Sequence, residues 1–140
     1  MAPHIAYEVE RLRFIVAQSD FMDQSNHGGV LREAFLIHFR NLVEFFYAPR
    51  KFKTDSIASD YADATWIPTV PVWWEEDKER CNKLLNHPAY ERVGYEKTGE
   101  LKWKRDFRQQ AAHLQNEWKA FLDSLPPERR AWFRTDRQEL

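Results

Sequence analysis

The sequence is poor in cysteine and glycine, with one cysteine, Cys81, and four glycines among 140 residues. A lone cysteine forms neither an intramolecular disulfide nor the paired pattern of a zinc or redox site. The scarcity of glycine argues against a β architecture with many tight turns. We therefore expect a cytoplasmic protein in a reducing compartment, with no metal and no other cofactor.

Long apolar runs, export signals and several familiar motifs are also missing. No window approaches 18 uninterrupted apolar residues, and no basic segment followed by an apolar stretch opens the chain. We expect no membrane partner. The GxGxxG, GxxxxGK[ST], GxSxG and HExxH patterns and the EF-hand loop are absent, which argues against P-loop nucleotide binding, a serine elbow and calcium sensing. The formal charge of -1 excludes a global basic field.

The residues that are present predict helices. The chain is 43% hydrophobic and 15% aromatic, and its length suits one domain, residues 1–140. Apolar residues recur at helical spacing over residues 5–22, 30–48 and 103–125, and a short helix opens at Pro127. Residues 75–87 have acidic residues first and basic residues later, the order that suits a helix dipole. Residues 30–48 are apolar almost all round, which is typical of a central helix. We expect an all-α, up-and-down bundle of four main helices plus a short C-terminal helix.

Two stretches between these helices are harder to interpret. Residues 23–29 are polar turn formers and predict a loop. The connector after Pro49 is long for a compact domain, so we expect it to contain structure of its own. A short helix over residues 55–64, capped by Asp55, and then an extended segment with Trp66 lying over the bundle are predicted.

The segment Arg-Cys-Asn-Lys-Leu-Leu-Asn-His, residues 80–87, combines a permanent cation with a titratable imidazole. Arg80 and His87 are seven residues apart, so a helix brings them within about 20° of one another. Two other pairs fit a similar spacing, Arg32 with His38 and Arg108 with His113. On a helix those pairs diverge by roughly 120° and 140°. Helical geometry therefore favours the Arg80 pair.

This segment resembles the R-x4-6-H motif of the HEPN superfamily of small all-helical proteins. Residues 32–46, the run Asn-Lys-Leu-Leu-Asn-His-Pro-Ala-Tyr-Glu-Arg-Val and a closing Phe-Leu-Asp-Ser-Leu-Pro also look like a family of small, mostly uncharacterised bacterial proteins. The resemblance implies a metal-independent endoribonuclease or RNA-binding protein of a bacterial defence or toxin-antitoxin type system, with a site often completed across a homodimer.

If the resemblance holds, the catalytic residues are Arg80, His87 and Asn82. His87 would move the proton when a ribose 2′-OH attacks its own phosphate, and Arg80 would stabilise the charge on the phosphorane. Asn82 could orient the phosphate or the imidazole. The alternative is a non-enzymatic helical interaction module with a degenerate motif, such as a toxin-neutralising partner or scaffold. In that case Arg80 pairs with Glu76 or Asp77, and His87 caps the helix.

Other polar and aromatic residues allow two interpretations each. Basic clusters such as Arg50, Lys51 and Lys53 could follow an RNA backbone or form solvated helix faces. His38 could be a satisfied core histidine or a second imidazole facing Arg80. Six tryptophans favour a core and also a self-association surface, so we expect a homodimer, with RNA or another protein as further possible partners.

Overall fold

The computed structural model describes residues 2–23, 25–63, 65–86 and 105–133. These residues form helices and connecting loops and include no strand, which confirms the all-α prediction. The α-helices are α1 (Ala2–Ala17), α2 (Asn26–Tyr47), α3 (Trp74–Asn86), α5 (Phe107–Ser124) and α6 (Pro127–Arg130), and the 3₁₀ turns are η1 (Ala58–Asp60) and η2 (Ala131–Phe133).

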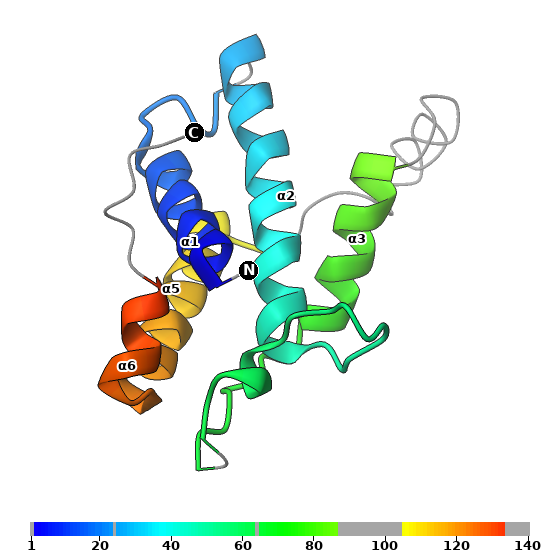
Figure 1. Cartoon of the computed structure of the whole chain (residues 1–140). Coiled ribbons are helices and arrows are strands. Elements are labelled where there is room, and N and C mark those ends of the chain that lie inside the picture. The colour runs from blue at the N-terminus through cyan, green and yellow to red at the C-terminus, as the bar shows by residue number, and fades with distance from the viewer. Residues whose placement is uncertain (1, 24, 64, 87–104, 134–140) are drawn as a thin grey trace.

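Helix α2 is the central element of the bundle (Figure 1). It packs against α1, α3 and α5, and successive main helices alternate in direction. One side of α2 buries a continuous set of apolar residues: Leu31, Phe35, Leu36, Phe39, Leu42, Val43, Phe45 and Phe46. The central position predicted from the apolar character of this segment is confirmed, because a helix with so broad an apolar surface needs neighbours on several sides.

Aromatic rings fill the space between α2 and α5. Phe121 of α5 is fully buried, and its ring lies 5.5 Å from that of Phe45 and 5.4 Å from that of Trp66. At the other end of α5, the Phe107 ring lies 4.7 Å from Phe35 and 5.3 Å from Phe21. Large rings at both ends of α5 therefore join it to the core, and truncating one of them would cost about 3–5 kcal/mol.

The first loop lies closer to the N-terminus than predicted, between Ala17 and Asn26. Helix α1 ends at Ala17, yet Phe21 remains fully buried in a turn that its backbone amide closes on the Gln18 carbonyl. The helical spacing of apolar residues therefore continues beyond Ala17, where α1 ends, and this is why the helix end was predicted too late in the sequence. Helix α2 begins at Asn26, because the Ser25 hydroxyl accepts a hydrogen bond from the Gly28 amide and caps the helix. The predicted loop over residues 23–29 thus contains the first turn of α2.

The predicted helix over residues 55–64 is wrong, since only the three residues of η1 are helical. The carboxylate of Asp55 does not cap η1. It accepts hydrogen bonds from the preceding amides of Lys51, at 3.0 Å, and Phe52, at 2.8 Å, and so closes the loop that follows α2. An aspartate can accept hydrogen bonds from the amides of a preceding loop or from the first amides of a following helix. The sequence alone did not show which of these two roles Asp55 has.

The extended segment after η1 lies against α5. The amide of Thr69 donates to the buried Glu117 carboxylate at 2.7 Å, and its carbonyl is 3.1 Å from Nε2 of His113. Trp66 packs partly buried against the core, and Trp74 begins α3, one residue before the predicted start at residue 75. The long connector is thereby held in place, and the helical structure among its described residues is the short 3₁₀ turn η1.

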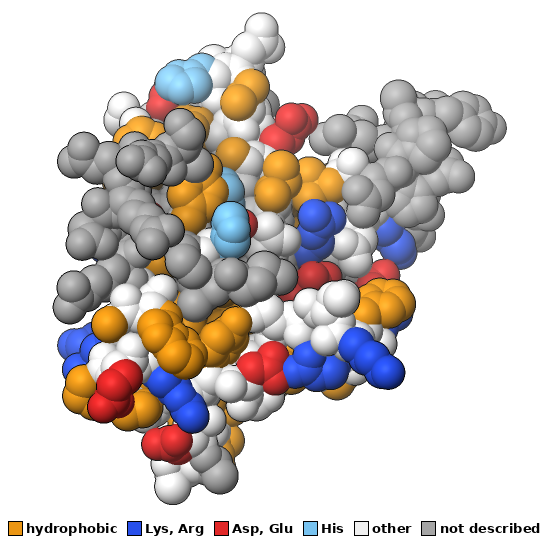
Figure 2. Space-filling view, viewed as in Figure 1, with side chains coloured by type: hydrophobic (Ala, Val, Ile, Leu, Met, Phe, Trp, Pro, Cys, Tyr) orange, Lys and Arg blue, Asp and Glu red, His pale blue; other side chains and the backbone are white. Residues whose placement is uncertain are grey.

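The C-terminal end of the described bundle follows the sequence closely. Helix α5 starts at Phe107 behind the N-cap Asp106, later than the predicted start at residue 103. Residues 105 and 106 are not helical, and residues 103 and 104 lie outside the described residues. The short terminal helix opens at Pro127 as expected. On the face shown in Figure 2, basic and acidic side chains are intermixed, as the near-zero charge suggested.

Candidate functional site

The structure places two of the three predicted site residues. Arg80 and Asn82 lie on α3, and His87 lies outside the described residues. Residues two positions apart on a helix point about 200° apart around its axis, so the side chains of Arg80 and Asn82 occupy different surroundings. Arg80 is buried beside the start of α5, whereas Asn82 lines a groove elsewhere on the bundle.

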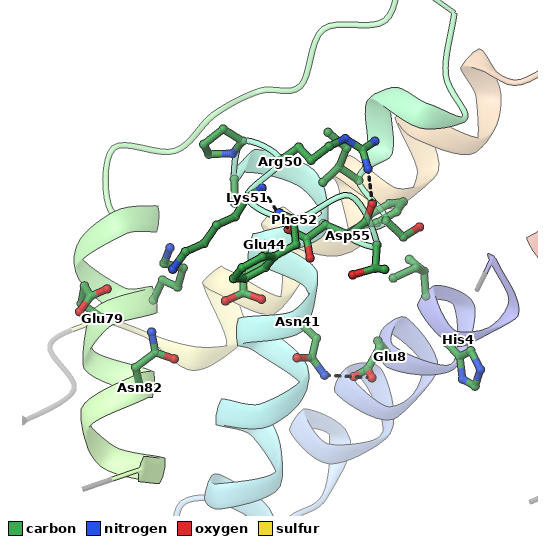
Figure 3. Close-up of a pocket in the computed structure, with 18 residues that line it drawn as sticks. His4, Glu8, Asn41, Glu44, Arg50, Lys51, Phe52, Asp55, Glu79 and Asn82 are labelled. Atoms are coloured by element: carbon green, nitrogen blue, oxygen red, sulfur yellow. Dashed lines mark hydrogen bonds between the residues drawn. The ribbon is translucent and has the colours of Figure 1, made fainter.

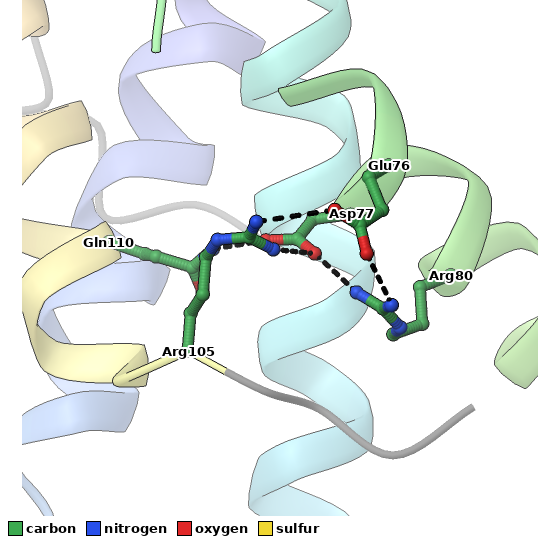
Figure 4. Close-up of polar contacts among 5 residues, drawn as sticks. All are labelled: Glu76, Asp77, Arg80, Arg105 and Gln110. Atoms are coloured by element: carbon green, nitrogen blue, oxygen red, sulfur yellow. Dashed lines mark hydrogen bonds and ion pairs between the residues drawn. The ribbon is translucent and has the colours of Figure 1, made fainter. Parts of the chain in front are cut away.

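Arg80 belongs to a network of two arginines and two carboxylates (Figure 4). Its Nη1 donates to Oδ1 of Asp77 at 2.7 Å, and its Nη2 donates to Oε1 of Glu76 at 2.7 Å. Arg105, just before α5, contacts the same two acids, with its Nη1 donating to Asp77 at 2.8 Å and its Nη2 to Glu76 at 3.2 Å. Each guanidinium thus bridges both carboxylates.

The centre of this network is Asp77, which is 1% exposed. Besides the two arginines, the buried side chain of Gln110 donates to its Oδ2 at 2.6 Å. Burial raises the pKa of Asp77 above its ordinary value, against the opposing influence of Arg105, Gln110 and Arg80. Three donors around one buried acid fix its position and, through it, the position of the Arg80 guanidinium.

Glu76 lies at the solvent edge of the same network. Its side chain is 51% exposed, compared with 7% for Arg80. Hydrogen bonds from Arg80 and Arg105 hold the pKa of Glu76 below its ordinary value. Glu76 is therefore the carboxylate of the network that a ligand from solvent would meet first.

Part of this network follows from local sequence. Glu75, Glu76 and Asp77 stand in the first turn of α3, where carboxylates suit the helix dipole. Arg80 follows at spacings of three and four, which places its side chain over Asp77 and Glu76. The pairing considered as the alternative role for Arg80 is therefore present. Arg105 and Gln110 were missed, because contacts across 28 and 33 residues leave no signal in a single sequence.

In each of the two other arginine–histidine matches, the arginine and the histidine contact different partners. Arg32 donates to the backbone carbonyls of Phe21 and Asp23 at 2.8 and 2.7 Å, which holds the first loop. His38 instead pairs through Nδ1 with the Glu8 carboxylate of α1.

In the remaining match, Arg108 and His113 also contact different parts of the bundle. Arg108 lies over the Phe21 ring, whereas His113 contacts the Tyr47 hydroxyl at 3.0 Å and Thr69. These two arginines and two histidines thus have structural contacts, and the described contacts of Arg80 are with Asp77 and Glu76.

Asn82 lines a groove of about 730 Å³ (Figure 3). Helices α1, α2 and α3 and the loop after α2 form its walls, and Glu8, Asn41, Glu44, Lys78 and Glu79 are among the polar residues that line it. Within the groove, Nδ2 of Asn41 donates to Oε1 of Glu8 at 3.1 Å, and Glu8 also holds His38. His38 is thus a satisfied histidine between α1 and α2.

Within the described residues, no group of three or more histidine, cysteine, aspartate and glutamate side chains could hold a metal ion. Among these same residues, none of the helices combines the length and apolarity that a membrane-spanning helix requires. Comparison of the chain with protein-family models, with curated proteins and with solved structures gave no match. The functional proposal below therefore depends on the residues of this chain.

Proposed function

We propose that this protein acts on RNA as a HEPN-like, metal-independent endoribonuclease of a bacterial defence or toxin-antitoxin type system. In this proposal Arg80 and His87 are the catalytic residues, and a homodimer completes the site. Asn82 is a supporting residue rather than a partner of Arg80, because it lines the groove and not the Arg80 network.

The observation that carries this proposal is the fixed guanidinium of Arg80. A buried ion pair contributes little to stability unless its geometry is good, because removing both charges from water costs several kcal/mol per ion. Here Asp77 holds one end of the guanidinium, and Glu76, at the solvent edge, holds the other. Clusters of buried charge with shifted pKa values are common at functional sites.

This arrangement suggests how an RNA phosphate would bind. A phosphate oxygen would replace the exposed Glu76 carboxylate on Nη2 of Arg80, while Asp77 keeps the guanidinium in place. The bound phosphate would then be attacked by the neighbouring 2′-OH, with the 5′-oxygen leaving. His87 would accept the 2′-OH proton and protonate the leaving oxygen, and Arg80 would stabilise the charge on the phosphorane.

The test is cleavage of mixed RNA by the purified full chain in EDTA, with the ends analysed for 2′,3′-cyclic phosphate. We expect cleavage by the native protein and a loss of at least about 100-fold in His87→Ala. His27→Ala is the matched control, because His27 is exposed and lies at the first turn of α2. Cleavage that survives His87→Ala, or that disappears equally in His27→Ala, contradicts the proposal.

A second candidate function is a non-enzymatic helical interaction module. The observation that favours it is the low exposure of the Arg80 side chain, 7%, with carboxylates on both of its terminal nitrogens. In that case Arg80 serves to attach α3 to the start of α5. Absence of cleavage by a folded native protein, together with stable co-purification of one protein partner, would favour this function over the first.

A further inference from the structure

The groove lined by Asn82 carries a second recognition surface, distinct from the Arg80 network. One wall is the loop that follows α2, with Lys51, Phe52 and Lys53 in sequence. The loop backbone is fixed, because Asp55 accepts from two of its amides and Arg50 pairs with Asp60. Phe52 is nevertheless 61% exposed, so a rigid loop presents a large aromatic ring to solvent between two lysines.

Some charged side chains that line the groove are held by hydrogen bonds from described residues, and others are available to a ligand. The carboxylates of Glu8 and Asp55 are occupied by hydrogen bonds from Asn41 and from loop amides. The side-chain carboxylate of Glu44 on α2 forms no ion pair or hydrogen bond with the described residues, although the Glu44 backbone carbonyl accepts from the Ala48 amide. The Lys51 ammonium group lies 5.6 Å from the centroid of the Phe52 ring itself, and that of Lys78 lies 5.5 Å from the centroid of the Trp74 ring. Neither forms an ion pair with a described residue.

The available groups therefore combine an exposed ring, two ammonium groups and two carboxylates, those of Glu44 and Glu79. Figure 3 shows Lys51 extending from the loop toward α3, where Asn82 lies, and Glu44 beside Phe52. An aromatic ring accompanied by cations is the usual arrangement for stacking a base and holding its phosphates. A carboxylate accepts hydrogen bonds from the edge of a base that presents adjacent donors, and among the four RNA bases guanine presents N1–H and N2–H₂ together.

We propose that this groove binds an unpaired segment of RNA and selects guanine at one position. Phe52 stacks on the guanine base, and Glu44 accepts from its Watson–Crick edge. Lys51 and Lys78 contact the flanking phosphates. The inference rests on the proposed action on RNA, and it adds the sequence preference of the RNA and the face of the bundle on which it is bound.

The experiment measures binding of 2′-O-methyl RNA hexamers to the full chain by fluorescence anisotropy. These probes lack the attacking 2′-OH, so binding is measured without cleavage. The hexamers carry guanine, adenine, cytosine, uracil or inosine at one central position in a uridine context. We expect guanine to bind about tenfold more tightly than the other three, and inosine, which lacks the N2 amino group, to lose most of that preference.

Three variants and two controls assign the effect to the groove. Phe52→Ala should weaken all hexamers about tenfold, and Lys78→Ala should reduce both affinity and its salt dependence. Glu44→Gln should remove the guanine preference without weakening the uridine hexamer. The controls are Phe14→Ala, an equally exposed phenylalanine on α1, and Lys119→Ala on α5, which should bind as the native chain does.

The possible results separate this inference from the proposed ribonuclease activity. Hexamers that bind equally to Phe52→Ala and to the native chain, or that show no base preference, overturn the groove inference even if RNA is cleaved. Guanine-selective binding that depends on Phe52 and Glu44 supports the inference even if no cleavage is found, in which case the ribonuclease proposal fails and the groove remains an RNA site.

Discussion

Cys81 follows Arg80 on α3 and is fully buried in the core. Burial, and then the nearby charge of Asp77, raise the pKa of its thiol above the ordinary value. Thiolate is the reactive form of cysteine, so a buried thiol that stays protonated is inert. We expect no reaction with Ellman's reagent at pH 8 in the native state and one equivalent of thiol after denaturation. Rapid reaction of the folded protein would show that α3 does not pack as described.

Glu76 gives the Arg80 network a defined pH dependence. Its pKa is lowered in the folded chain, so its contribution to stability is present above the unfolded-state pKa of about 4.3 and is lost as the pH falls through the lowered folded value. The difference in the free energy of unfolding between the native chain and Glu76→Gln should therefore be largest near pH 7 and shrink toward pH 3. Urea denaturation at several pH values measures it, and a difference that stays constant with pH would contradict this role.

At the residue scale, local spacing predicted half of the Arg80 network. The partners three and four residues earlier, Asp77 and Glu76, follow from helix geometry. The partner from the start of α5, Arg105, required the fold, because it lies 28 residues from Asp77 and no local spacing indicates that contact. The two-residue spacing of Arg80 and Asn82 already places them on different faces of α3. The groove around Asn82 was not predictable, because its walls come from segments that are distant in the sequence.

At the scale of the element, the first turn of α2 contains two glycines with opposite roles. A Cβ at Gly28 would lie 2.4 Å from the Asp23 carbonyl oxygen and 2.7 Å from that of Asp20, whereas a Cβ at Gly29 would meet nothing within 4 Å. Gly28→Ala should therefore destabilise the protein by about 1–3 kcal/mol, because backbone must move. Gly29→Ala should stabilise it by about 0.5–1 kcal/mol, because alanine has the better helix propensity.

Thermal or urea denaturation of the two variants checks this pair, and each variant is the control for the other. Equal effects of the two substitutions would mean that the loop before α2 does not close on the helix as described. The native conformation of that loop also has a second support, since Arg32 donates to the carbonyls of Phe21 and Asp23.

Helix identity was predictable from the sequence, and helix ends were less so. The broad apolar surface of α2 and the regular apolar spacing of α5 predicted both helices. The end of α1 was misplaced because Phe21 keeps the apolar spacing although it sits in a turn. The helix predicted after Asp55 was wrong because its carboxylate caps the preceding loop and not the following residues.

At the scale of the whole molecule, the bundle places two polar regions at different positions around α3. The Arg80 network lies where α3 meets the start of α5, and the groove lies where α3 meets α2 and the loop after it. The bundle architecture was predicted from periodicity, whereas both polar regions depend on contacts between distant segments.

The most direct test of the proposed activity compares Arg80→Lys with Arg105→Lys in the RNA cleavage assay. Both arginines bridge the same two carboxylates, and both variants keep the positive charge. We expect both variants to fold, with the larger loss of stability in Arg80→Lys, because the Arg80 side chain is 7% exposed and that of Arg105 is 31% exposed. If Arg80 stabilises the phosphorane, Arg80→Lys loses at least about 100-fold in cleavage while Arg105→Lys retains most of it. Equal cleavage by the two folded variants, or none by the native protein, would contradict the proposed function.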